Sequence, residues 1–194
     1  YKDQEFTSFI QSHEGDFYDH FFALQNPVEI VYNPDRFHLS RCELAVSNAR
    51  AFFEANREKD AVSSELILKR FPLDVLSLNP LDVEIAGQID CKVTLNEKNG
   101  KVDGKLKAEI FQMEVEEIPQ LVSGHIEGKL QNERLDLSGS LPPYLNCDLS
   151  LPVHIELLNP KVDFLYTKEV TGNLTLKGKI EEILDYFDLG PHRI

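Results

Sequence analysis

The sequence predicts an all-β protein in which a long antiparallel sheet folds over on itself into a groove. Apolar and polar residues alternate along most of the chain, and this period of two is the pattern of strands with one apolar and one solvated face. The turn signals between the alternating runs are too short for crossover connections. Few segments have a helical pattern that could cover the apolar face, so the sheet must cover itself.

The first seventy residues have the less regular pattern. Residues 28–32 and 37–46 are predicted as strands from their apolar and β-branched content. Residues 49–60 fit either a strand or a helix capped by Ser47 or Asn48, and we favour the strand.

The alternation is strictest after residue 82. Odd positions from Val83 to Leu95 are apolar or glycine, and the positions between them are mostly polar. Asn99-Gly100 then predicts a two-residue hairpin turn, because both central positions of a type I′ turn need positive φ. Further alternating runs follow in residues 102–110, 124–130, 135–141, 145–157 and 170–180, with a polar break at Asn132-Glu133.

Glycines recur on the apolar face of these runs. Glycine in a strand often marks a bend or a place where another group approaches closely, so these positions predict that the sheet curls. They are Gly87, Gly104, Gly128, Gly139, Gly172 and Gly178. Short helical turns are expected at residues 72–78 and 181–187.

The organisation of the chain suggests one segment, residues 1–194, of a larger protein built from repeated β units. Two Gly-centred units, within residues 71–194, follow one another at an offset of roughly eighty residues, which is too long for a short-period solenoid. The chain begins at Tyr1 rather than methionine and contains no run of about 20 apolar residues, so any targeting signal or anchor is expected outside it.

Composition excludes several classes of partner. The formal charge of −13 argues against binding nucleic acid and against docking on anionic headgroups, since both need a basic surface. The three cysteines lie in step with aliphatic neighbours, so we interpret them as small core residues rather than as a disulfide pair: Cys42, Cys91 and Cys147.

No residue pattern points to catalysis, a metal or a cofactor. The segment from His13 to His20 is the one local group with metal-ligand residue types, and a solvated acidic segment is the favoured interpretation. His125 and His154 fall on the polar side of their strands and are expected to be exposed. Because no phosphate loop, nucleophile elbow or zinc motif is present, we predict a protein that is not an enzyme.

The chain resembles the carboxy-terminal region of the TamB family, the translocation and assembly module proteins of bacterial envelopes. The resemblance rests on Phe71-Pro72-Leu73 with the strand after it and on residues 170–184, a succession of strand, glycine, strand and short helical turn. The strands at 27–30 and 39–46 have the same style, and AsmA-like proteins share it. The resemblance implies a β-taco-like groove in the periplasmic part of an inner-membrane-anchored protein.

The same resemblance implies a function in outer-membrane biogenesis. Family members pass phospholipid between the inner and outer membranes, and are linked to assembly with an outer-membrane barrel partner, whose contacts would lie outside this chain. Phospholipid acyl chains would then lie along ten predicted groove residues: Ile85, Ile89, Val93, Leu106, Ile126, Leu137, Leu149, Ile155, Leu174 and Leu176.

Two rival functions remain open at this stage. The first is an interaction module whose edge strands add to strands of a partner. The second is a closed barrel that holds a ligand. The alternation alone also fits a packed core, so sequence does not separate a filled interior from an open trough.

Overall fold

The computed structural model describes residues 5–11, 13–17, 20–76, 85–115, 118–157, 161–165 and 167–177, and these residues are almost entirely β-strand. The strands are β1 (Phe6–Ile10), β2 (Glu14–Phe17), β3 (His20–Leu24), β4 (Val28–Asn33), β5 (Arg36–Val46), β6 (Ala49–Glu58), β7 (Ala61–Pro72), β8 (Ile85–Lys98), β9 (Lys101–Val115), β10 (Ile118–Gln131), β11 (Arg134–Leu141), β12 (Leu145–Glu156), β13 (Lys161–Phe164) and β14 (Thr171–Leu176). One short helix, α1 (Leu73–Leu76), follows β7.

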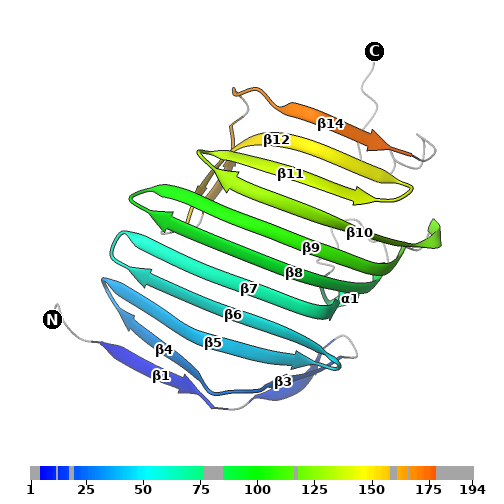
Figure 1. Cartoon of the computed structure of the whole chain (residues 1–194). Helices are drawn as coiled ribbons and strands as arrows, with labels where there is room; N and C mark the ends of the chain where they lie inside the picture. Colours follow the sequence, from blue (N-terminus) through cyan, green and yellow to red (C-terminus); the bar gives the residue numbers. More distant parts are fainter. Residues whose placement is uncertain are drawn as a thin grey trace, which may run out of the picture.

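All fourteen strands form one antiparallel sheet that does not close (Figure 1). Its main path runs β1-β4-β5-β6-β7-β8-β9-β10-β11-β12-β13. At the amino-terminal side, β5 pairs with β4 along one half and with β3 along the other. At the opposite side, β12 pairs with β14 and then with β13 in the same manner. The predicted long antiparallel sheet is therefore confirmed.

Local predictions from the sequence are largely confirmed. Residues 49–58 form strand β6 rather than a helix. Asn99-Gly100 makes the predicted hairpin turn, with φ of 52° and 71°, and the polar break at Asn132-Glu133 is a second such turn, with φ of 53° and 58°. Helix α1 lies within the expected 72–78 turn, while residues 181–187 lie outside the described part of the chain.

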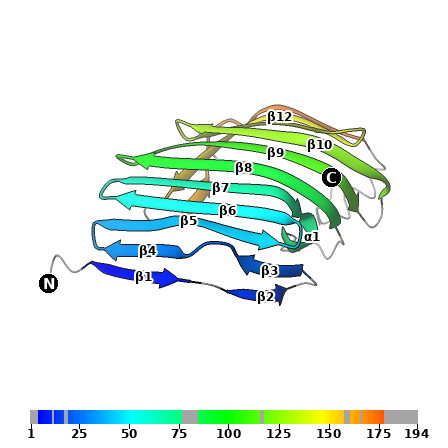
Figure 2. The same cartoon turned by 60° about the horizontal axis from the view of Figure 1, so that its bottom comes forward.

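The sheet is strongly arched, and bulges contribute to the arch (Figure 2). The register shifts in β5, β7 and β9, where an extra residue bends the strand and increases its twist. In β7 the bulged Arg70 has a φ of 50°, and its N–H donates to Asp90 Oδ1 at 2.6 Å. In β9 the N–H of Gln112, with a φ of 49°, donates to Ser123 Oγ at 2.9 Å. Side chains of the next strand thus satisfy the N–H groups that the bulges remove from the ladder.

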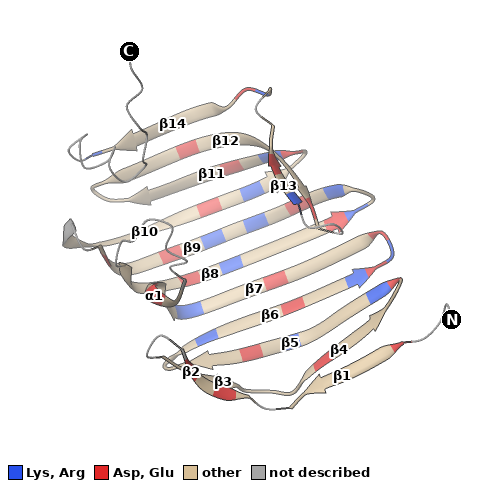
Figure 3. Ribbon diagram, turned by 180° about the vertical axis from the view of Figure 1, so that it is seen from behind, with Lys and Arg blue, Asp and Glu red and all other residues tan. Residues whose placement is uncertain are grey.

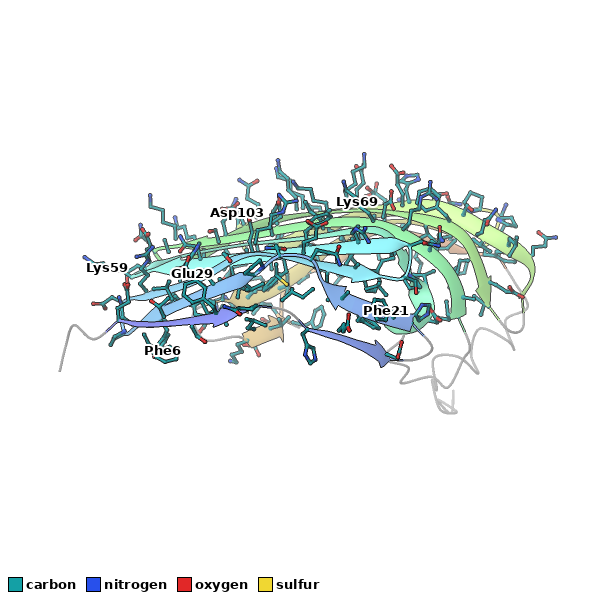
Figure 4. All side chains as sticks on the ribbon, turned by 90° about the horizontal axis from the view of Figure 1, so that it is seen from below. Phe6, Phe21, Glu29, Lys59, Lys69 and Asp103 are labelled. Carbon is teal, nitrogen blue, oxygen red and sulfur yellow. The ribbon has the colours of Figure 1, made fainter. Side chains whose placement is uncertain are left out.

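The arch gives the sheet a convex charged face and a concave apolar face. Glu29, Lys69 and Asp103 rise from the convex side, whereas Phe6 projects from the other side (Figure 4). Helix α1 and strand β13 both lie on the concave side, near opposite ends of the strands (Figure 3). The expected groove is thus a curled, one-sided sheet open between these two covers.

The best-packed part of the core lies beside α1. Four buried residues form its centre, and Val75 of α1 packs against them. These are Val46, Ala49, Leu68 and Phe71. Smaller buried positions lie elsewhere, among them Val122, Leu130 and Val153.

Glycines on the concave face make room for side chains of the adjacent strands, as the sequence predicted. A Cβ at Gly104 would lie 2.6 Å from Leu95 Cδ2, and one at Gly128 would lie 3.0 Å from Leu137 Cδ2. At Gly87 and Gly172 an added Cβ would also meet backbone atoms of the neighbouring strand, and their φ of 121° and 137° is a conformation that side chains rarely adopt. Close approach therefore explains these four glycines, while Gly178 lies outside the described residues.

We predict that Gly124→Ala lowers the free energy of unfolding by about 1–3 kcal/mol. The new Cβ would collide with the Ser140 carbonyl oxygen and approach Leu141 Cδ2 to 2.9 Å, so the β10–β11 backbones would have to separate. Urea denaturation measures the change. Gly15→Ala is the matched control, because nothing lies within 4 Å of its added methyl group. Equal stability of the two variants would contradict the close approach.

Candidate functional site

The concave face is built from rows of side chains that cross the sheet from strand to strand. Each strand contributes alternate residues to this face, and the register places them opposite one another. One row, the central row, contains Cys42, Phe53, Leu66, Val93, Leu106, Gly128, Leu137, Leu149 and Gly172. The row beside it contains Leu44, Ala51, Leu68, Cys91, Ala108, Ile126, Gly139, Cys147 and Leu174.

The structure brings nine of the ten predicted groove residues onto this face. Four of them lie in the central row, and Ile126 and Leu174 lie in the row beside it. Ile85, Ile89 and Leu176 share their strands' concave side. Ile155 lies apart from them, because the second half of β12 leaves the main sheet to pair with β13, where Ile155 faces Val162.

The central row is half-buried rather than buried. Leu66, Val93, Leu106, Leu137 and Leu149 all keep part of their surface exposed, and Phe53 is 41% exposed. By contrast, Phe71 beside α1 is 5% exposed and Leu130 is 4% exposed. Apolar side chains at the middle of a sheet are normally its most buried residues when a second layer covers them. The middle of this concave face is therefore a partly open apolar surface.

A strap covers one end of the concave face. We use this name for residues 153–156 of β12 together with β13, which form a separate ladder. The strap is anchored at both ends of its β12 portion: Val153 N–H donates to the Glu133 carbonyl at 2.9 Å, and Leu157 N–H donates to Glu97 Oε2 at 2.7 Å. A cleft of about 460 Å³ lies between the strap and the β8–β9 and β10–β11 turns, lined partly by Val102, Leu130, Val153 and Ile155.

An ionic cluster fastens the strap to the β10–β11 turn. His154 Nδ1 lies 3.1 Å from Glu133 Oε1, and its Nε2 lies 3.1 Å from Glu156 Oε1. Lys168 Nζ lies 2.7 Å from the other oxygen of Glu133. Hydrogen bonds to Glu156 and Glu133 raise the pKa of His154, and those from Lys168 and His154 lower the pKa of Glu133. His154 is half-buried, not exposed as predicted, because the strap turns its strand toward this cluster; His125 is exposed as expected.

Two charged residues on the concave face, Arg57 and Glu97, were not predicted from the sequence. Arg57 of β6 pairs across the strands with Phe37 and Val62, and Glu97 of β8 pairs with Val62 and Val102. Each stands two residues beyond the last apolar residue on the concave side of its strand, after Ala55 in β6 and after Leu95 in β8. Extending the alternation to the ends of these strands would have found both residues. Glu97 is 4% exposed.

The convex face carries charges that pair across neighbouring strands. Lys92 Nζ lies 2.5 Å from Glu65 Oε1, and Lys107 Nζ lies 3.6 Å from Glu127 Oε1. Phe52, an aromatic residue on this side, lies under Arg41, whose guanidinium carbon is 4.6 Å from the ring centroid. This pattern is that of a solvated surface.

Among the described residues, the cysteines contribute packing, and the segment near His13 contributes one ion pair, in which His20 Nε2 lies 2.9 Å from Asp74 Oδ2. All three cysteines are free and half-buried, and burial raises the pKa of the Cys42 and Cys91 thiols. The 13–20 segment contributes to the β2–β3 hairpin, with Glu14 and Asp16 exposed. Within the described ranges, no three His, Cys, Asp or Glu side chains gather as a metal site. Nor does any helix there have the length and apolarity needed to cross a membrane.

Comparison of the chain with protein-family models, with curated proteins and with solved structures found no match.

We predict that His154 titrates above the ordinary histidine value of about 6.5. Its raised pKa means that its contribution to stability is fully present below that value and is lost as pH rises through the folded pKa. Glu133 acts in the opposite sense: its contribution is present above the ordinary glutamate pKa and is lost as pH falls through its lowered pKa. Proton NMR titration of the imidazole measures the shift. Glu156→Gln should lower the His154 pKa, whereas Glu127→Gln, on the convex face, should leave it unchanged.

Proposed function

We propose that the concave face is a groove segment of an envelope-spanning bacterial protein that carries phospholipid between the inner and outer membranes. The observation that supports this most directly is the half-exposed central row, an apolar track that crosses the sheet from β5 to β12. Acyl chains on such a track stay out of water and gain about 0.8 kcal/mol per buried methylene. Passage along it is passive, and no enzyme chemistry is involved.

The location and partners of the protein follow from the same proposal. The chain would be the periplasmic part of a protein anchored in the inner membrane, and its contacts with an outer-membrane barrel partner would be made by other regions. The alternating face in this chain would be one section of a longer track. The resemblance to the TamB family supports this proposal, and AsmA-like proteins fit it equally well.

Photo-crosslinking in the full-length protein in cells tests the groove. A photoreactive amino acid at Ile126 should yield lipid adducts, because Ile126 lies on the concave face beside Ala108 and Gly139. The same group at Glu127, the next residue on the convex face, should yield none. Protein adducts alone at both positions would contradict a lipid-carrying groove.

Charge substitutions at the same two positions test passage itself. Ile126→Asp should block lipid passage because an unpaired carboxylate interrupts the apolar track. Glu127→Lys, its control, should have little effect. Undiminished lipid flux in the Ile126→Asp variant would count against the conduit.

An assembly module that binds barrel proteins by strand addition is the second candidate. Strand β1 favours it, since β1 pairs with β4 on one side and, within the described residues, has no strand on the other. Its Phe6, Phe9 and Ile10 are 63%, 60% and 45% exposed, which is the composition of a sticky edge. Thr7→Pro would then impair barrel assembly while Ile126→Asp is tolerated.

A further inference from the structure

One row of concave-face residues lies next to the β4–β5, β6–β7 and β8–β9 turns, and its residue types differ from those of the rows inside the groove. This lip row contains Phe6, Tyr32, Phe37, Arg57, Val62, Glu97 and Val102. Its first members are aromatic, whereas the central row is mainly aliphatic and contains no charged residue. Arg57 and Glu97 are the charged members of the lip row. The concave face thus changes from aliphatic to aromatic and ionic at this edge.

Glu97 already has a structural partner, because its Oε2 accepts the Leu157 N–H of the strap at 2.7 Å. Arg57 is in a different position, two strands away on β6. Its Nη2 donates to the Pro34 carbonyl at 2.7 Å, and its buried Nε has no hydrogen-bond partner. None of the ion pairs between described residues includes Arg57. Its positive charge therefore lies at the edge of an apolar surface without a counter-charge.

The surroundings of Arg57 match those of side chains at the headgroup level of a membrane. Tyrosine and arginine occur there because each has an apolar body and a polar tip. Tyr32, in the same row, is 51% exposed. A guanidinium has five N–H donors. In Arg57 the Nε–H is buried and one Nη2 hydrogen goes to the Pro34 carbonyl, which leaves three Nη hydrogens to meet phosphate oxygens.

We infer that Arg57 binds the phosphate of a phospholipid whose acyl chains lie on the concave face. This inference rests on the proposed function and adds the position and chemistry of headgroup recognition. The net charge of −13 repels anionic surfaces at long range, so a zwitterionic phospholipid, which carries no net charge, is the suitable ligand. The strap is bonded to the lip row at Glu97 of β8, and Arg57 lies two strands away on β6.

The test compares two probes on the whole chain: pyrene-labelled phosphatidylcholine and a pyrene-labelled diacylglycerol with the same acyl chains. Wild-type protein should bind the phosphatidylcholine more tightly. Arg57→Gln should weaken phosphatidylcholine binding about tenfold, the size expected for a lost charge-assisted hydrogen bond, and leave diacylglycerol binding unchanged. Arg57→Lys should give an intermediate loss. Arg50→Gln, on the same strand but the convex face, should affect neither probe.

The other outcomes are distinguishable from one another. Equal wild-type affinity for the two probes, or an Arg57→Gln variant that binds both as tightly as wild type, would overturn phosphate recognition and leave the groove intact. A parallel loss of both probes with a lower unfolding temperature would assign Arg57 a structural role and also overturn it. Failure of the wild-type protein to bind either probe would overturn the proposed groove function itself. Glycerophosphocholine, which has the headgroup without chains, should compete weakly; full competition would indicate a free phosphate ester site instead.

Discussion

The period-two alternation of side chains is the constraint on which the rest of this structure depends. It gives a very large sheet one face that water solvates and one face that water does not, while the described residues include a single short helix to cover the latter. The bulges in β5, β7 and β9 let the sheet curl over its own apolar face, and the strap and α1 cover parts of what remains. The curling of the sheet, the strap and the half-exposed central row all follow from one fact: little other structure is present to cover the apolar face.

Curling leaves some backbone N–H groups without a ladder partner, and nearby side chains supply acceptors for them. A bulge removes an N–H group from the ladder, and Asp90 and Ser123 each supply an acceptor from the adjacent strand. Tight coiling brings neighbouring strands close on the concave side, where glycines leave space for leucines such as Leu95 and Leu137. The glycines therefore leave space on the narrowed side of the sheet for the leucines of neighbouring strands.

Most of the fold could be predicted from sequence because alternation and turn chemistry are local properties. The hairpin at Asn99-Gly100 and the strand at 49–58 needed no knowledge of distant contacts. The strap was missed because residues 145–157 keep one apolar parity throughout, although Pro152, which has no N–H for the ladder, is the last of them to pair with β11. The hydrogen bonds that hold the strap come from Glu97 and Glu133, which are far away in the chain. Its consequences were missed for the same reason: Ile155 lies apart from the groove, and His154 is half-buried.

The distribution of burial bears on two interpretations of the concave face that the sequence left open, a filled core and an open trough. A sheet curled to make a filled core would bury its central row most completely, since those side chains are furthest from every edge. Here the central row is less buried than its surroundings: Leu68 and Ala108 in the row beside it, and Phe71 and Leu130 further along the strands, are almost completely buried. Leu66 and Val93 of the central row are half-buried. The central row is therefore an apolar surface that stays partly exposed, and the proposed track rests on this feature.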